Sequence, residues 1–482
     1  MGSLDAILVA LGFRLFGEKV LVIRVLQGLL FLATVFTTVL LSRRIIKSDR
    51  AALYAGLLLS LPTVNVTLYS TVSLGGYGEM LLIGNLLLLG GLPLAEQVRD
   101  NTTDNRLPLY VSVFLWSFGA GFAFWVFGLT LVYSLPIIGL LIWSAWKSEN
   151  RTGMWKTGCI GLAGGLIGSL PWWFEALING NLLILSELAG GAIADVNQGV
   201  WLLRPLTRLV NLLIFGGSVI MGIRPPWSVQ WLVMPALPLI LVFWVIVFLY
   251  SLRLLQDKTR RNQFIPIAAI GLVLSVGFIL SPYGDDPSGR YFLPLSIPMV
   301  IFGALALTDL LKKYPILQIG TLALVLLYNL TGTIQAERSS ATGITTQIDK
   351  ITQIDHKYIN ELAKFLNDKN ITRGYTNYWI SYPLAFLSEE ELIFVPRLPY
   401  HQDFRYTARD DRYPPYGELV KNSEEVAYIT TNHPELDNYL RQQFRSKNLS
   451  WRENKIGDFL VFYNLSDLIH PQEMDLGTTT TP

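Results

Sequence analysis

The chain has 482 residues, of which 51% are hydrophobic and only 15% are charged. Soluble globular proteins average about 25% charged residues, so this composition indicates a protein that faces lipid. The formal net charge of +2 gives no sign of a nucleic-acid-binding surface, and the single cysteine, Cys159, excludes a disulfide within the chain. We therefore expect an integral membrane protein that contacts membrane lipids and has no nucleic-acid partner.

Ten hydrophobic runs have the length that a helix needs to cross the hydrocarbon core of a bilayer. They are Val20–Leu41, Ala51–Val72, Gly78–Ala95, Leu107–Phe124, Val126–Trp146, Trp155–Ile178, Leu232–Leu252, Phe264–Leu280, Tyr291–Leu311 and Ile316–Thr333. The alternative is a soluble helical protein, but a soluble fold could not cover so many wholly apolar helices. The sequence thus predicts a membrane all-α fold, a polytopic bundle of about ten helices.

Lysine and arginine fall in alternate loops, beginning with Arg43, Arg44, Lys47 and Arg50 after the first run. Because cationic loops face the cytoplasm, the alternation places the N-terminus and the C-terminal portion on the extracytoplasmic side. The segment Leu4–Phe16 is too short to span and is expected to lie at the outer surface. No earlier span carries Met1 outward, so we expect one more helix upstream in a natural parent protein.

Two further outer stretches, Arg204–Met221 and Arg224–Trp231, are interpreted as interfacial segments because one is interrupted and the other is rich in tryptophan and proline. The glycine-rich stretch Gly161–Ser169 lies inside a membrane run, where small residues allow close helix packing.

The character of the sequence changes after Thr333, where helical and strand-like patterns alternate. Helices are expected at Gln347–Asn367 and Glu435–Arg445, and strands at Gly374–Ile380, Leu392–Val395, Val426–Thr430 and Phe459–Tyr463. We therefore divide the chain into a transmembrane domain (1–336), a C-terminal extracytoplasmic α/β domain (337–470) and a disordered, threonine-rich tail (471–482).

Several short segments resemble those of the bacterial membrane glycosyltransferases of family 39 and their relatives, which belong to the GT-C class. The opening MGSLDAILVALGFRLFG is one, and the others include GGYGEMLLIG, SLPWWFEALING, SGRYFLPLSIP, GYTNYWISYPLAFLSEEE and RYPPY. The resemblance implies a GT-C bundle in a bacterial plasma membrane. It also implies transfer of a sugar from a polyprenyl-phosphate donor to a lipid, glycan or protein acceptor on the extracytoplasmic face. Such chemistry needs a carboxylate to deprotonate the acceptor and cationic groups to neutralise the departing phosphate.

In that family the principal carboxylate lies just before the segment that matches GSLDA, which would place it upstream of Met1. Two carboxylates remain as catalytic candidates, Asp5 on the outer juxtamembrane segment and Glu79 at the outer end of a membrane helix. A solvated surface charge is the simpler explanation for Asp5. Because a carboxylate that enters a membrane helix is costly, a functional role for Glu79 is as well supported as a structural one.

The resemblance also indicates a donor-phosphate site at Arg290 and Tyr291, since a matching pair recurs in the family. Arg24 lies near the outer end of the first run and could face the same phosphate or snorkel to the interface. Asp285 and Asp286 form an outer loop that could bind the acceptor or a metal, although paired aspartates also suit a simple turn.

The sequence defines no cofactor. Its four histidines, His356, His401, His433 and His470, have no metal-ligand spacing, so zinc is not expected, whereas a divalent metal is compatible with the outer carboxylates. Two other functions stay open. A lipid or glycan transporter would also be polytopic, although no internal repeat is visible and the unusual charges lie at helix ends. A non-catalytic GT-C-like protein would explain the missing upstream carboxylate.

Overall fold

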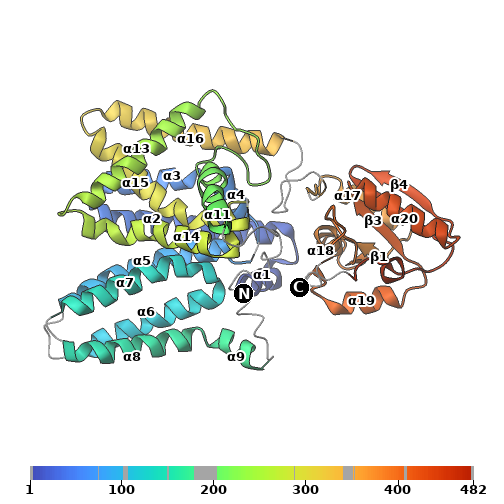
Figure 1. The fold of residues 1–482 in the computed structure, drawn as a ribbon, viewed down its shortest axis with the longest axis horizontal. Helices are drawn as coiled ribbons and strands as arrows, with labels where there is room; N and C mark the ends of the chain where they lie inside the picture. The colour runs from blue at the N-terminus through green and yellow to red at the C-terminus, as the bar shows by residue number, and fades with distance from the viewer. Residues whose placement is uncertain are drawn as a thin grey trace. The chain divides into compact units, whose positions relative to one another are not determined.

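The computed structural model describes residues 4–73, 75–100, 107–148, 151–178, 203–286, 288–339, 351, 353–406 and 410–478. The chain divides into two compact units, Met1–Arg338 and Ser339–Pro482, which are described separately (Figure 1).

The N-terminal unit is built from helices. The long ones are α2 (Val20–Ile46), α5 (Tyr77–Arg99), α6 (Leu107–Val126), α7 (Leu131–Lys147), α8 (Arg151–Gly168), α13 (Leu237–Gln256), α14 (Arg261–Leu280), α15 (Ser296–Leu310) and α16 (Pro315–Arg338). The shorter ones are α1 (Leu4–Phe16), α3 (Asp49–Ser60), α4 (Val64–Thr71), α9 (Leu170–Ile178), α11 (Arg204–Val210) and α12 (Gly217–Ile220), with the 3-10 turns η1 (Gly128–Thr130), η3 (Pro282–Asp285) and η4 (Arg290–Leu295).

Eight segments in the described ranges are long and apolar enough to cross a membrane, and α3 with α4 would form a ninth. This is fewer than the ten predicted. The run Trp155–Ile178 was counted as one span, but α8 ends at Gly168 and α9 begins at Leu170, and α8 opens with cationic residues. The expected membrane bundle is present, and the protein is an integral membrane protein.

The pair α3 and α4 bends by 74° at the break between Ser60 and Val64. Pro62 lies at the break, and the residue before a proline is biased away from helical geometry. The carbonyl of Leu61 accepts a hydrogen bond from Asn329 Nδ2 of α16 at 2.8 Å. A backbone group that the bend releases from its helix is therefore satisfied by a neighbouring helix.

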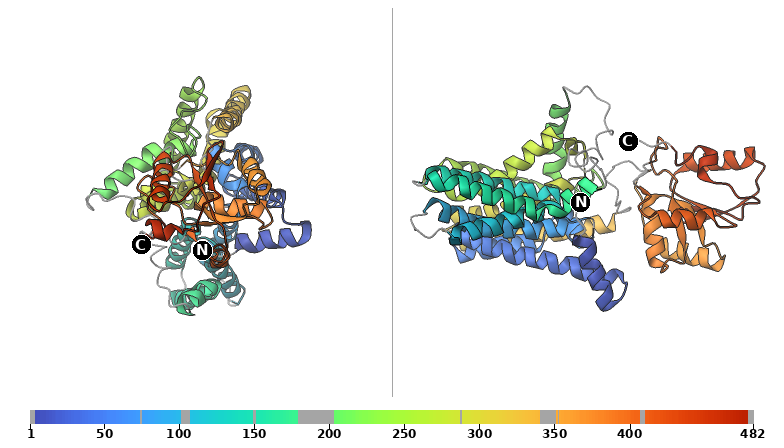
Figure 2. Two further views of the ribbon diagram at one scale, coloured as in Figure 1. Left: turned by 90° about the vertical axis from the view of Figure 1, so that its right-hand side faces the viewer. Right: turned by 90° about the horizontal axis from the view of Figure 1, so that it is seen from below.

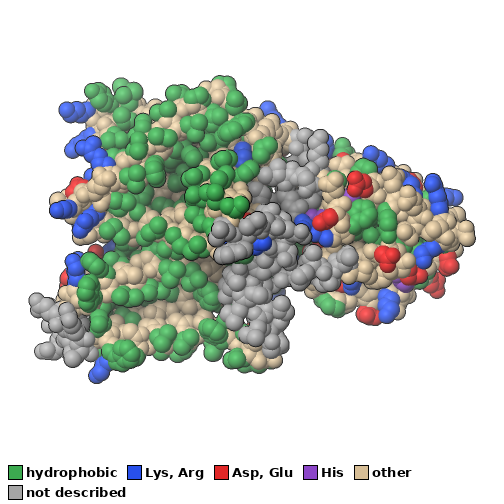
Figure 3. Space-filling view, in the orientation of Figure 1, with side chains coloured by type: hydrophobic (Ala, Val, Ile, Leu, Met, Phe, Trp, Pro, Cys, Tyr) green, Lys and Arg blue, Asp and Glu red, His purple; other side chains and the backbone are tan. Residues whose placement is uncertain are grey.

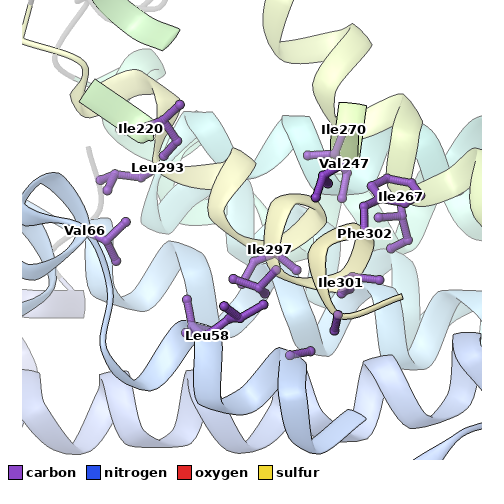
Figure 4. Packing of buried hydrophobic residues seen from close by; sticks show 14 of the residues in the cluster. Leu58, Val66, Ile220, Val247, Ile267, Ile270, Leu293, Ile297, Ile301 and Phe302 are labelled. Atoms are coloured by element: carbon purple, nitrogen blue, oxygen red, sulfur yellow. The ribbon is translucent and has the colours of Figure 1, made fainter. Parts of the chain in front are cut away.

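Helix α15 lies at the centre of the N-terminal unit. About 78% of its membrane segment is buried, against 17% for α2, which therefore has mostly lipid to face. Figure 4 shows Ile297, Ile301 and Phe302 of α15 between Leu58 of α3 and the side chains of α13 and α14. Helices α5, α6, α7 and α8 form a neighbouring stack that two views show side by side (Figure 2).

Side chains on the N-terminal unit are sorted by type. On the face drawn in Figure 3, hydrophobic groups cover the flank, while Lys and Arg gather at the end where α13 passes into α14. Such a surface suits a bilayer with one cationic interface.

The C-terminal unit is an α/β fold around a five-stranded sheet with the order β2-β1-β3-β5-β4. The strands are β1 (Arg373–Thr376), β2 (Ile393–Pro396), β3 (Ala427–Thr431), β4 (Arg452–Ile456) and β5 (Phe459–Tyr463). Strand β1 is parallel to β2 and β3, whereas β5 is antiparallel to both β3 and β4. The main helices are α17 (Ile359–Asp368), α18 (Tyr378–Leu387), α19 (Pro414–Lys421) and α20 (Pro434–Ser446).

Each face of the sheet has its own apolar core. Leu362 of α17 and Ile380 of α18 pack with Phe394 and Ile429 in one cluster, and Phe444 of α20 belongs to a second cluster. Neighbouring strand residues such as Phe394 and Val395 join different clusters, because successive side chains on a strand point to opposite faces.

Three expectations for this unit need correction. The run Gly374–Ile380 is not one strand, because Asn377 caps α18 by accepting a hydrogen bond from the Trp379 amide. The first helix begins at Ile359, and the part of its predicted range before residue 351 lies outside the described residues. The tail was expected to be disordered from residue 471, but Pro471–Met474 forms the turn η6, and Met474 and Leu476 are buried in the core.

Candidate functional site

The predicted site residues lie on four neighbouring segments of the N-terminal unit. These are α1, α2, the first turn of α5 and the η3–η4 turn. Gly75 and Gly76 have φ values of 82° and 95°, a left-handed conformation that glycine adopts without strain, and they turn the chain from α4 into α5. Gly289, with φ of 75°, does the same before η4. Asn65 Nδ2 donates to the Gly289 carbonyl at 3.2 Å and so ties α4 to that turn.

The structure brings the two catalytic candidates together. Asp5 is 8% exposed and Glu79 is 2% exposed, and their carboxylates lie beside each other. Asp5 Oδ1 accepts a hydrogen bond from Gln27 Nε2 of α2 at 2.9 Å, and Oδ2 accepts one from Ser73 Oγ. Both oxygens of Glu79 are buried, and the side chain that they face is that of Asp5. Asp5 is therefore not the solvated surface charge that was considered simplest.

Arg290 and Tyr291 form a second cluster. Arg290 Nη2 makes an ion pair with Asp286 Oδ2 at 2.8 Å, and its guanidinium lies over the Tyr291 ring at 4.9 Å. The phenol groups of Tyr69 and Tyr77 also lie close to Arg290. The side chain of Arg290 is 26% exposed, and its buried Nε has no hydrogen-bond partner in the described part of the chain. The cluster thus combines a guanidinium that has a donor to spare with several hydroxyl groups.

The acid pair and the arginine cluster are connected through two packed tyrosine rings. The rings of Tyr69 in α4 and Tyr77 in α5 pack with centroids 5.3 Å apart. Tyr77 precedes Glu79 by two residues, and Ser73 follows α4 and binds Asp5. The acid pair and the arginine cluster therefore both contact the segment that joins α4 to α5.

Asp285 and Asp286 do not act as one acidic pair. Asp285 accepts two hydrogen bonds from Arg208 of α11, at 3.2 Å from Nε and 2.9 Å from Nη2, and both side chains are almost fully buried. Asp286 instead pairs with Arg290. No group of three or more His, Cys, Asp or Glu side chains that could hold a metal occurs among the described residues.

Arg24 is placed differently from the other phosphate candidates. Its Nη1 donates to the carbonyl of Thr71 in the last turn of α4 at 2.6 Å. A cation at the C-terminal end of a helix also complements the helix dipole. Arg24 therefore has a structural contact that accounts for its position.

Sequence reasoning missed Gln27, Ser73, Tyr69, Tyr77 and Arg208. A glutamine inside the apolar run of α2 was a usable signal, because buried polar groups in membrane helices need partners. The pairing of Arg208 with Asp285 had none, since 77 residues separate them.

The overall arrangement is a membrane bundle of helices followed in the chain by a sheet domain, as the sequence predicted. Two solved structures of ArnT from Cupriavidus metallidurans show it. ArnT bound to undecaprenyl phosphate has a TM-score of 0.54 and 13% sequence identity, and the match covers 100% of this chain and 89% of that one. ArnT in the apo state has a TM-score of 0.55 and 14% identity, with coverage of 99% and 88%. At these identities the likeness establishes the fold.

No protein-family model matches the chain, and no curated protein matches it.

Proposed function

We propose that the protein is a membrane glycosyltransferase that moves a sugar from a polyprenyl-phosphate donor to an acceptor on the extracytoplasmic face. The observation that carries this proposal is the Arg290 cluster, which has a free buried donor and reaches Tyr77 in the same first turn of α5 that carries Glu79. It occurs in a fold shared with ArnT, one structure of which is bound to undecaprenyl phosphate. Loops rich in lysine and arginine would face the cytoplasm and leave the site outside.

Arg290 is the proposed ligand of the donor phosphate. A guanidinium makes strong, directional hydrogen bonds to phosphate, and these strengthen as charge develops on the leaving group. Asp286 holds one edge of Arg290 through Nη2, so the remaining donors are left for phosphate oxygens. The hydroxyl groups of Tyr69 and Tyr77 would add neutral donors on the same side.

The Asp5–Glu79 pair supplies the carboxylate that the reaction needs. The acceptor oxygen attacks the anomeric carbon while the bond from that carbon to the phosphate oxygen breaks and its electrons stay on the phosphate. The acceptor proton passes to the carboxylate pair. Direct displacement with one base inverts the anomeric carbon. Gln27 and Ser73 hold Asp5 in place beside Glu79.

The test compares membranes that carry Glu79→Gln, Arg290→Lys or the control Glu96→Gln. Glu96 lies on the same helix but is exposed and pairs with Arg44. Membranes of source cells that lack the wild-type protein supply the acceptor, and transfer of labelled sugar from the lipid-linked donor is followed over time.

We expect Glu79→Gln to lower kcat by about 10²–10⁴-fold, the usual contribution of a general base. Arg290→Lys should raise KM for the donor, because an ammonium cannot form the paired contacts of a guanidinium. Glu96→Gln should match the wild type. Wild-type rates in both site variants would refute the proposal.

A further inference from the structure

The C-terminal unit gathers aromatic and charged side chains at one edge of its sheet. Strands β1 and β2 are parallel, so their carboxyl ends meet at the same edge, which is where α/β sheets commonly bind ligands. Tyr378 lies two residues after the end of β1, and Arg397 directly follows β2. Arg397 Nη2 pairs with Asp411 Oδ2 at 2.6 Å, and the Tyr382 hydroxyl accepts a hydrogen bond from the Arg412 amide at 2.6 Å. These two contacts hold the loop before α19 against the same edge.

Four tyrosines from α18 and the start of α19 form a row of packed rings. Tyr378 packs on Tyr382 with centroids 5.6 Å apart, Tyr382 stacks on Tyr416 at 6.4 Å, and Tyr416 contacts Tyr413 at 4.9 Å. The Arg412 guanidinium lies over the Tyr378 ring at 4.8 Å. Tyr413 is 50% exposed, and Tyr378 and Tyr382 are half-buried. The tyrosine row therefore offers apolar ring faces together with polar tips to a ligand.

Two hydrogen-bonding atoms near this row are left unused. Tyr406 is 3% exposed, and its hydroxyl has no hydrogen-bond partner among the described residues. Asp411 Oδ1 is also buried without such a partner there, although Oδ2 accepts from Arg397. The Arg397 guanidinium also lies over the Tyr406 ring at 5.6 Å, and its side chain is 28% exposed. The two unused atoms thus belong to residues that contact one partly accessible arginine.

The chemistry of these atoms restricts the class of ligand. A carboxylate oxygen paired with a guanidinium only accepts hydrogen bonds, so the ligand must supply a donor to Asp411 Oδ1. A phosphate or carboxylate ligand has no such donor, and a metal cation would be repelled by Arg397. Alcohol groups both donate and accept, so neighbouring alcohols on one ligand can satisfy Asp411 and Tyr406 together. A pyranose ring carries such alcohols beside an apolar C–H face that fits against an aromatic ring.

We propose that this edge of the C-terminal unit binds a neutral hexopyranose oligosaccharide. One sugar ring stacks on the tyrosine row, one sugar hydroxyl donates to Asp411 Oδ1, and the Tyr406 hydroxyl donates to a neighbouring sugar oxygen. Both buried polar groups then gain the partner that removes the cost of their lost hydration. The proposal concerns a second site, separate from the Arg290 cluster, and does not depend on the proposed transferase activity.

The experiment measures saturation-transfer NMR from the purified full chain, in a detergent without a sugar headgroup, to maltotriose, mannotriose or chitotriose. We expect transfer to the ring C–H protons of at least one of these trisaccharides. Tyr406→Phe should weaken its binding about two- to tenfold while the Tm stays equal or rises, because the deleted hydroxyl has no partner in the protein. Tyr428→Phe is the matched control. Its hydroxyl donates to the Ile469 carbonyl at 2.6 Å, so this variant should lower the Tm and bind the sugar as the wild type does.

Absence of transfer from the wild type to all three trisaccharides would overturn the proposal. Equal binding by Tyr406→Phe and the wild type would also overturn it and would indicate that water fills the two positions. Tyr413→Ala alters an exposed ring, so it keeps the test decisive if Tyr406→Phe does not fold, and unchanged binding by Tyr413→Ala would contradict stacking on the tyrosine row.

Arg290→Ala separates this site from the proposed transfer site. It should bind the trisaccharide as the wild type does, and loss of binding in that variant would place the sugar in the N-terminal unit and overturn the proposal. Sugar binding by a protein that transfers no sugar would refute the transferase and leave this site standing. Transfer of sugar by a protein that binds none of the trisaccharides would do the reverse.

Discussion

The close packing of α6 against α8 leads to a specific prediction about the stability of the N-terminal unit. A Cβ added at Gly121 of α6 would lie 2.1 Å from the Gly165 carbonyl oxygen and 3.0 Å from the Ser169 amide nitrogen. These are backbone atoms of the facing segment, so no flexible side chain can move aside. Carbon–oxygen contacts between close helices are normally about 3.3–3.6 Å, so Gly121→Ala must separate the helices by more than about 1 Å. Overpacking of this kind costs about 1–3 kcal/mol.

Gly119 provides the matched control, since it lies on the same helix and an added Cβ would meet only Leu87 Cδ2, at 4.0 Å. Gly119→Ala should be neutral or stabilise the helix by up to about 1 kcal/mol, because alanine has the higher helix propensity. Thermal unfolding of the two variants in the same detergent gives the comparison. A Tm for Gly121→Ala equal to that of Gly119→Ala would refute the close backbone packing of α6 against α8.

Three further predictions concern buried charge. Arg224 is 4% exposed and donates to the Ser218 hydroxyl and to several backbone carbonyls, so Arg224→Ala should lower the free energy of unfolding by about 2 kcal/mol, and Arg224→Lys should fail to restore the Tm. Removing Arg208 alone should lower the free energy of unfolding by about 3–5 kcal/mol, because it leaves the buried Asp285 unpaired. Replacing both residues with leucine should restore most of that loss. A double variant whose loss equals the sum of the two single losses would contradict this prediction. Burial raises the pKa of Asp410 to about 6, against the opposing charge of Arg412, so the folded unit holds this proton more tightly than the unfolded chain does. Its stabilising contribution is complete below the unfolded pKa of 3.8 and is lost as pH rises through 6. Asp410→Asn should therefore raise stability by about 1 kcal/mol above neutral pH and leave it unchanged in acid, and an equal effect at both ends of a pH series of unfolding curves would contradict this.

The large features of the fold follow from composition and periodicity, because lipid requires long apolar helices and a half-buried sheet requires apolar strands. Strand β4 was not predicted because Arg452–Ile456 is mostly polar. It lies at the edge of the sheet, where it forms a strand by pairing with β5. The break between α8 and α9 was missed because hydropathy averages over a local interruption.

Candidate site residues could be chosen from the sequence where a charge entered an apolar run, as at Glu79 and Arg290. The side chains that contact these charges could not be predicted from the sequence, because tertiary packing determines which residues meet. Nothing local shows that Gln27 and Ser73 both bind Asp5, or that adjacent aspartates turn to different arginines.

The central claim, that this protein recognises a polyprenyl phosphate through Arg290, is tested most directly by native mass spectrometry of the purified chain. The chain would be offered undecaprenyl phosphate or undecaprenol, with Arg290→Ala and the exposed control Arg253→Ala in parallel. We predict that the wild type and Arg253→Ala retain the phosphate lipid at collision energies that strip the alcohol, and that Arg290→Ala loses this difference. Equal retention of both lipids by the wild type, or an unchanged preference in Arg290→Ala, would contradict the account.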